Sequence, residues 1–238
     1  MSKHSKRYVA HTGKWGIPTK QDFWAPKSKP GPHKAKDSVP LVVLVRDILQ
    51  YAESSREAAA IIGEKKILVD GKKVKDKNIP VGFMDVISIP SLDEHYRVLF
   101  DQRGKVRLGP VAENMENWKL CRIEDKSVIN GGKVQLNLHD GRNLLVEDGS
   151  KYNTKDVLKI EIPSQKIIES YEFEEGNMAL ITGGKHIGEL AKIKEHEVIR
   201  GPQKNIVHFD NDISTTEDYV FIIGKEKPII KIPEVGII

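Results

Sequence analysis

Cysteine is almost absent from this chain of 238 residues, because Cys121 is the only one. A single cysteine excludes an internal disulfide framework and any zinc site built from several cysteines. We therefore expect Cys121 to be a small buried apolar residue. The low cysteine content also favours a reducing, cytoplasmic location.

Long apolar runs are missing as well. The longest uncharged apolar stretch, residues 39–45, is far shorter than the roughly 20 residues that span a bilayer. The basic N-terminus has no apolar segment of the kind that secretory signals carry. We therefore expect neither a membrane partner nor a secreted protein.

The motifs of common enzyme classes are incomplete. Residues 131–133 and 183–185 both have the sequence Gly-Gly-Lys, but they lack the earlier Gly and the following Ser or Thr of a phosphate-binding P-loop. Glycine turns are the better interpretation. The chain has no Gly-x-Ser-x-Gly nucleophile elbow, and His4, His11 and His33 have no ligand-like spacing. These absences predict no catalytic residue, no metal site, no cofactor and no small-molecule substrate.

Positive charge is concentrated at one end. Hydrophobic residues make up 39% and charged residues 30% of the chain, which is ordinary for a folded soluble protein. Of the 38 Lys and Arg residues, nine lie in residues 1–37, where only two acidic residues accompany them. The remaining residues carry 29 basic and 32 acidic side chains. The cationic character therefore belongs mainly to the N-terminal segment.

Residues 1–37 are predicted to form a basic arm. The segment is rich in Pro and Gly and has little apolar periodicity, so it cannot bury enough surface to fold alone. Its aromatic residues Tyr8, Trp15, Phe23 and Trp24 lie among cations, a combination that suits stacking on bases and neutralising phosphates. The alternative is that the Trp residues pack back onto the next domain.

A helix, a second helix and a hairpin are predicted after the arm. Apolar residues recur at helical spacing over residues 41–52. Ser54 followed by Glu57 has the pattern of a capping box, and Gly63 stands where a left-handed C-terminal stop is expected. Asp70-Gly71 lies between two short apolar runs and predicts a tight hairpin turn.

Cations surround these elements. Arg56 opens the second helix, Lys65 and Lys66 follow its end, and Lys72 and Lys73 lie in the hairpin. A helix N-terminus attracts anions and basic side chains strengthen that field, so the arrangement suits the phosphate backbone of a structured RNA. An ordinary solvated face is the alternative.

The remainder is predicted to be rich in strands. A short helix bearing Trp118 is expected over residues 113–120, and alternating apolar residues on either side of Asp140-Gly141 predict a hairpin. His139, Arg142 and Asn143 of this hairpin are candidates for RNA contact, and a purely structural turn is the alternative. Further alternating segments follow to the end of the chain. The predicted fold class is α+β.

The helix–hairpin stretch resembles the S-four-type RNA-binding motif. Three spaced features carry this resemblance: Ser55-Arg56-Glu57-Ala58, Val69-Asp70-Gly71-Lys72, and the Gly-x-x-Asp-x-Ile pattern of residues 82–87. Residues 176–193 resemble the KOW motif, a strand–loop–strand unit. Ala191 stands where many KOW members carry a second glycine, which weakens inference about the conformation of that loop.

The order of these features resembles the S-four-e family of small-subunit ribosomal proteins, and the short C-terminal end favours its archaeal branch. The resemblance implies a basic arm at 1–37, an S-four-type RNA-binding domain at 38–92, a central β domain at 93–171, and a KOW-like SH3-type barrel with a C-terminal strand at 172–238. It implies a non-enzymatic constituent of the cytoplasmic ribosome, with ribosomal RNA and neighbouring small-subunit proteins as partners.

Two other functions remain open. One is a KOW-type RNA-binding factor associated with transcription or translation. The other is an RNA-modifying enzyme, because the S-four-type motif often precedes a pseudouridine synthase domain. Such enzymes carry a catalytic Asp in an Arg-Leu-Asp context, whereas Asp140 precedes Gly and Arg. The candidate RNA-binding residues are Lys3, Lys6, Arg7, Lys14, Trp15, Lys20, Trp24, Arg46, Ser55, Arg56, Lys65, Lys66, Lys72, Lys73, His139, Arg142, Asn143 and Lys185.

Overall fold

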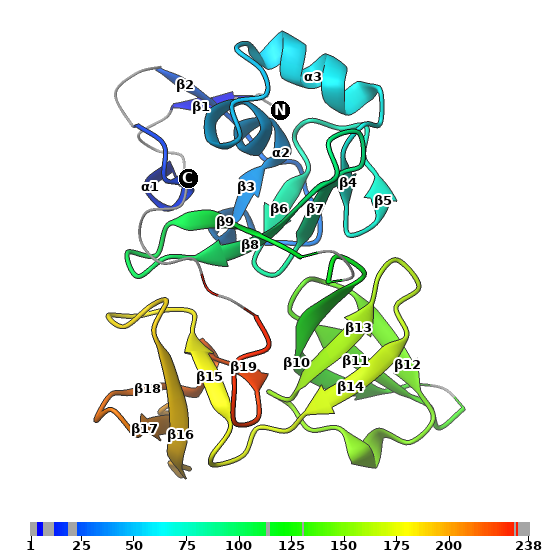
Figure 1. Cartoon of the computed structure of the whole chain (residues 1–238). Helices are drawn as coiled ribbons and strands as arrows, with labels where there is room; N and C mark the ends of the chain where they lie inside the picture. Colours follow the sequence, from blue (N-terminus) through cyan, green and yellow to red (C-terminus); the bar gives the residue numbers. More distant parts are fainter. Residues whose placement is uncertain are drawn as a thin grey trace.

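The chain forms three units, described here from a computed structural model. The structure describes residues 4–6, 12–18, 23–112, 115–129, 131–230 and 232. The first unit holds the helices and strands up to β9, and two β units lie side by side beneath it (Figure 1). The predicted contact residues Lys3, Arg7 and Lys20 lie outside the described residues.

The predicted helices form in the first unit. The first begins as α2 (Leu41–Val43) and continues as a π-helical turn over Leu44–Ile48, in which the Leu49 N–H donates to the Leu44 carbonyl. The second is α3 (Ser55–Gly63), whose first turn is capped by a hydrogen bond from the Glu57 N–H to Ser54 Oγ at 3.2 Å. The Glu57 carboxylate in turn accepts from the Glu53 N–H, one residue before the N-cap, so the Ser54 half of the predicted capping box is present and the return bond is shifted by one residue.

The end of α3 differs from the prediction. Gly63 is not in the left-handed region, and the residue that reverses the chain is Lys65, with φ of 59°. Hydrogen bonds from the Glu64 N–H to Ala60 and from the Lys65 N–H to Ile62 carry helix-like geometry past Gly63. The reversal therefore comes two residues later than the glycine suggested.

The first unit contains a larger sheet than the sequence predicted. Its order is β5-β4-β7-β8-β9, and a separate pair joins β3 (Ser38–Pro40) to β6 (Pro80–Gly82). We expected the central domain to begin at residue 93, but β8 pairs with β7 along residues 86–89. Pro90 ends a strand without ending the sheet, because the chain turns back at once through Asp93, which has φ of 54°. The strands are β4 (Leu68–Val69), β5 (Lys72–Lys73), β7 (Val86–Ile89), β8 (Glu94–Phe100) and β9 (Val106–Pro110).

The described parts of the arm lie against the first unit. β1 (His4–Lys6) pairs with β2 (Trp24–Pro26), and α1 (Thr12–Trp15) and a 3-10 turn at Ala35–Asp37 complete the segment. Trp15, Ile17 and Ala25 are buried in the same core as α2. The arm therefore supplies part of the core of the first unit, even though it has too few apolar residues to form a core of its own.

The central unit is a five-stranded antiparallel sheet, with order β12-β11-β10-β13-β14. The helix predicted over residues 113–120 is wrong in its described part, because Trp118 begins the long strand β10 (Trp118–Val128). Residues 118–121 are buried on both faces of that strand, a pattern that a surface helix does not have. Cys121 is buried as predicted. The other strands are β11 (Val134–Leu138), β12 (Asn143–Val146), β13 (Val157–Glu161) and β14 (Ile167–Tyr171), with a 3-10 turn at Gly149–Lys151.

The third unit is a second five-stranded sheet, with order β18-β17-β16-β15-β19. Ala191 is a buried residue of strand β16, and the left-handed residues of the preceding loop are Gly184 and Gly188, with φ of 82° and 83°. The α+β prediction is confirmed: among the described residues α-helices occur only in the first unit, and two small β units follow it. The strands are β15 (Met178–Ile181), β16 (Leu190–Glu197), β17 (Ile206–Phe209), β18 (Ser214–Thr216) and β19 (Val220–Gly224), with a 3-10 turn at Glu217–Tyr219. Within the described ranges, no helix is long and apolar enough to cross a bilayer.

Candidate nucleic-acid interface

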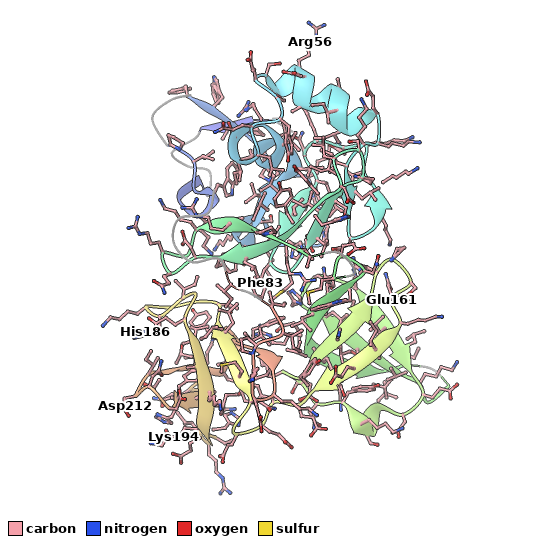
Figure 2. The ribbon with its side chains drawn as sticks, in the orientation of Figure 1. Arg56, Phe83, Glu161, His186, Lys194 and Asp212 are labelled. Carbon is pink, nitrogen blue, oxygen red and sulfur yellow. The ribbon has the colours of Figure 1, made fainter. Side chains whose placement is uncertain are left out.

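The first unit carries exposed cations on α3, on the residues that follow it and on strand β5. Arg56 projects into solvent from the start of α3, at the extremity of the molecule (Figure 2). Lys65 follows α3, and Lys72 and Lys73 form the exposed strand β5. None of these four makes an ion pair with any residue that the structure describes, whereas Lys66 pairs with Glu64 at 2.6 Å. We call Arg56, Lys65, Lys66, Lys72 and Lys73 the cationic platform.

Local sequence fixes the platform in place. The hairpin between β4 and β5 turns through Asp70 and Gly71, whose φ values are 50° and 71°, as a tight two-residue turn requires. The Asp70 carboxylate accepts from the Val86 N–H at 2.9 Å, which ties the turn to strand β7. The exposed lysines of β5 are therefore held by a turn whose aspartate points inward.

The described arm residues separate into buried and exposed groups. Trp15, predicted to stack on bases, is instead a core residue: it is only 3% exposed, and its Nε1–H donates to the Ser38 carbonyl at 3.1 Å. Trp24 is 56% exposed and remains open to a partner. Lys14 is exposed and pairs with Asp37 at 2.8 Å. Lys6 is described only as part of β1.

A cavity of about 1020 Å³ is lined by residues of the arm and by residues of the first unit that follow it in sequence. Arg46 and Ser55, both predicted contact residues, line it together with Trp24. Arg46 makes two hydrogen bonds to Asp47, at 3.0 and 2.9 Å, and Ser55 Oγ accepts from Lys77 Nζ at 3.1 Å. The cavity thus brings together three of the predicted residues. We call it the arm cavity.

The central hairpin is only partly exposed. Asp140 and Arg142 belong to a buried charge cluster around Lys119, which has no exposed surface. Lys119 Nζ lies 2.9 Å from Asp70, 2.7 Å from Asp85 and 2.8 Å from Asp140. Arg142 bonds to both Asp70 and Asp140. The cluster therefore joins the first unit to the central unit, because Asp70 and Asp85 come from one and Asp140 from the other.

Electrostatics holds Lys119, Asp85 and Asp140 in their charged forms, whereas burial and the neighbouring Asp85 raise the pKa of Asp70. Burial alone would lower the pKa of Lys119, but Asp85, Asp70 and Asp140 together hold that pKa well above its usual value. Despite burial, Lys119 is the main cause that lowers the pKa of Asp85 and brings the pKa of Asp140 to about 2. The three carboxylates are close enough to hold a cation, and the lysine ammonium occupies that position.

His139 lies at the junction of all three units. Its Nδ1 accepts from the Arg122 N–H at 3.2 Å, and its Nε2 lies 3.3 Å from the Phe83 carbonyl. Its ring packs edge-on against Phe83 and Phe221. Burial lowers the pKa of His139 to about 4. His139 and Arg142, predicted to contact RNA, are therefore structural residues of the junction, and Asn143 is the hairpin candidate that remains exposed.

The predicted residues do not form one surface. Platform residues lie on the first unit, with Arg56 at its extremity, whereas exposed Lys185 lies on the third unit, next to the labelled His186 (Figure 2). The sequence analysis missed Lys119, although a lysine inside the apolar run 118–121 was a usable signal of a buried charge. It also missed Lys27, Lys77 and Asn78, whose positions in the arm cavity depend on tertiary packing.

Comparison with known proteins places the chain in a family. The model described as Ribosomal family S4e matches residues 92–167, and the S4 domain model matches residues 39–87. The small ribosomal subunit protein eS4 of Methanocaldococcus jannaschii is 46% identical over 241 residues, covering 97% of each chain. The protein of the same name from Archaeoglobus fulgidus is 44% identical over 233 residues, covering 95% of this chain and 97% of the relative.

A solved structure agrees with these relatives. The crystal structure of the 30S ribosomal protein S4e from Thermoplasma acidophilum has a TM-score of 0.70 and 36% sequence identity, and the match covers 79% of this chain and 96% of that chain. The shared fold, the two matching family models and the identity over nearly the whole length lead to one conclusion. This chain belongs to the S4e family of ribosomal proteins.

Proposed function

We propose that this chain is a structural constituent of the small ribosomal subunit, where it binds ribosomal RNA and supports subunit assembly and translation. Membership of the S4e family supports this role and a location on the cytoplasmic ribosome, beside neighbouring small-subunit proteins. The single observation that carries the RNA-binding part is the cationic platform, in which Arg56, Lys65, Lys72 and Lys73 are exposed on the first unit without acidic partners among the described residues.

The platform binds phosphates by position and charge. Its cations come from a capped helix and a tight hairpin, so they are held on a rigid surface before RNA arrives. Each phosphate that a Lys or Arg neutralises releases condensed counterions, which gives binding its affinity and its dependence on salt. The exposed arm residues Lys14 and Trp24 extend the RNA-binding surface beyond the platform.

Salt dependence tests the platform. The Arg56→Ala, Lys72→Ala, Lys73→Ala triple variant should bind small-subunit ribosomal RNA more weakly, with a log–log salt slope flatter by roughly 0.7–0.9 for each phosphate that is no longer neutralised. A matched triple variant of exposed lysines on the central unit, at Lys133, Lys151 and Lys166, serves as the control. Filter binding across a salt series measures both. Equal slopes in the two variants would show that the platform does not contact phosphates.

Catalysis is not part of the proposed function. Asp140 is the residue on which an RNA-modifying activity would depend, and it is 1% exposed and bonded to Lys119 and Arg142. A carboxylate enclosed in this way has no access to an RNA base. Mass spectrometry of small-subunit RNA incubated with the protein tests this, and a modified nucleoside that disappears with Asp140→Asn would contradict it.

A further inference from the structure

The arm cavity has two walls of different origin. One wall comes from the arm, with Trp24, Lys27 and Lys29, and the other comes from the first unit, with Arg46, Lys77 and Asn78. Its volume of about 1020 Å³ lies at the upper end of the range of roughly 300–1,000 Å³ that is usual for ligand pockets. A ligand of nucleotide size therefore fits between the arm and the helical elements.

The charge of the cavity favours an anion. Its lining contains four cationic side chains, at Lys27, Lys29, Arg46 and Lys77, and one carboxylate, at Asp76. Lys29 pairs with Asp76 and Arg46 pairs with Asp47, so Lys27 and Lys77 are the cations considered for the ligand. Lys77 uses one N–H to reach Ser55 Oγ and retains two donors. Lys27 is exposed and has no ion-pair partner among the described residues.

The cavity also offers a surface for a base. Trp24 lines it and is 56% exposed, while the Phe23 ring holds the indole edge-on at a centroid distance of 4.9 Å. The side-chain amide of Asn78 lines the opposite wall and has no hydrogen-bond partner within the described part of the chain. An aromatic face, an amide with both donor and acceptor, and nearby cations are the groups that recognise an unstacked nucleotide.

We propose that the arm cavity binds one unpaired nucleotide of the RNA, with its base on Trp24, its base edge at Asn78 and its phosphate at Lys27 and Lys77. This inference rests on the proposed function, because it assigns a subsite to the same RNA partner. A base-paired segment does not fit, since its bases are stacked inside the duplex and only its backbone and groove edges are accessible. The ligand is therefore a nucleotide in a bulge, a loop or a single strand.

Tryptophan fluorescence reports directly on this subsite. Trp15 and Trp118 are buried, so a base that stacks on Trp24 should account for RNA-dependent quenching. The full chain is titrated with small-subunit ribosomal RNA, first as wild type and then as Trp24→Phe. The wild type should be quenched, and Trp24→Phe should bind with similar affinity but without quenching, because phenylalanine keeps an aromatic face. Quenching that survives in Trp24→Phe would overturn the assignment.

RNA-binding affinity distinguishes base stacking on Trp24 in the cavity from a general effect of removing an exposed aromatic side chain. Trp24→Ala should weaken RNA binding roughly ten-fold, as expected for loss of one base–aromatic stack. The matched control is Tyr219→Ala, because Tyr219 is an aromatic residue of the third unit that is 40% exposed and does not line the cavity; it should change affinity less than three-fold. Equal losses in the two variants would overturn the proposal.

Nucleotide mapping identifies the ligand. Chemical probing of the complex should find an unpaired nucleotide that the wild type protects and that Trp24→Ala and Asn78→Ala leave reactive. Protection confined to base-paired nucleotides, or unchanged in both variants, would overturn the nucleotide subsite alone. Failure of the wild-type chain to bind the RNA at all would instead contradict the proposed function, so the two failures are distinguishable.

Discussion

At the scale of single residues, burial decides which predicted RNA-binding side chains are accessible. Trp15 and Trp24 are both tryptophans of a basic segment, yet one is a core residue and the other is open to solvent. In the central hairpin, the His139 ring packs against Phe83 and Phe221, whereas Asn143, four residues later, is exposed. Composition identified the residue types that suit RNA, but it carries no information about which of them the fold encloses.

His139 predicts a pH dependence of stability. Its folded pKa of about 4 is below the unfolded value of about 6.5, so the folded state favours the neutral ring. Its contribution is therefore fully present above pH 6.5 and is lost as pH falls from there through pH 4. The maximum is about 3 kcal/mol, from roughly 1.4 kcal/mol for each pKa unit.

His139→Asn tests this assignment. The variant keeps an acceptor near the Arg122 N–H but cannot be protonated, so its free energy of unfolding should fall less between pH 7 and pH 4 than that of the wild type. Urea unfolding at a series of pH values measures the difference. Burial opposes protonation of His33, but Asp85 raises the pKa of His33 above its usual value, so the contribution of His33 to stability has the opposite pH dependence. Both proteins contain His33, and its contribution therefore cancels in the difference between the wild type and His139→Asn. Parallel pH curves would contradict the role of His139.

At the scale of elements, the N-cap and hairpin-turn signals were reliable, whereas the Gly63 stop, the helix expected over residues 113–120 and the pairing between strands were not. The cap at Ser54 and the turn at Asp70-Gly71 depend on neighbours in sequence, and both formed as predicted. The assignment of β8 and β9 to the first sheet depends on which strand each one meets. Lys119 illustrates the same limit, because its three carboxylates come from turns and loops that are distant in sequence.

The hairpin turn at Gly141 predicts a cost that depends on packing. Gly141 and Gly132 have nearly equal φ values, 74° and 76°, but a Cβ at Gly141 would lie 3.0 Å from the Pro32 carbonyl oxygen, whereas a Cβ at Gly132 would meet nothing within 4 Å. Both Ala variants should lose about 1 kcal/mol from the left-handed backbone. Gly141→Ala should lose more, because the backbone of Pro32 must also move.

Thermal or urea unfolding of the two glycine variants gives the comparison. A similar loss in both would mean that the turn and Pro32 separate without cost, and that the arm does not pack firmly on the central hairpin. A larger loss of unfolding free energy for Gly141→Ala would support a turn that both reverses the chain and packs against Pro32. The sequence predicted the turn, and only the fold reveals the second function.

At the scale of the whole molecule, the three units share their packing. One apolar core extends from α2 residues through Trp118 and Val157 of the central unit to Phe221 of the third unit. Arg122 of β10 donates from Nη1 to the Asp218 and Val220 carbonyls, both at 2.8 Å. Phe83 of the first unit meets Phe221 edge-on at a centroid distance of 4.9 Å. We therefore expect the units to act as one body when the platform binds RNA.

Lys119→Met should destabilise this body as a whole. The substitution leaves Asp70, Asp85 and Asp140 buried without their ammonium partner, and breaking a buried ion pair in this way costs about 3–5 kcal/mol. Because the core is continuous, urea unfolding should remain a single transition with a lower midpoint. Lys133→Met, on an exposed lysine of the same unit, should stay within about 0.5 kcal/mol of the wild type.

Adding Asp140→Asn to Lys119→Met removes one of the unpaired charges and should recover part of the loss. A double variant no more stable than Lys119→Met would mean that Lys119 acts through its packing, and that charge does not join the first and central units.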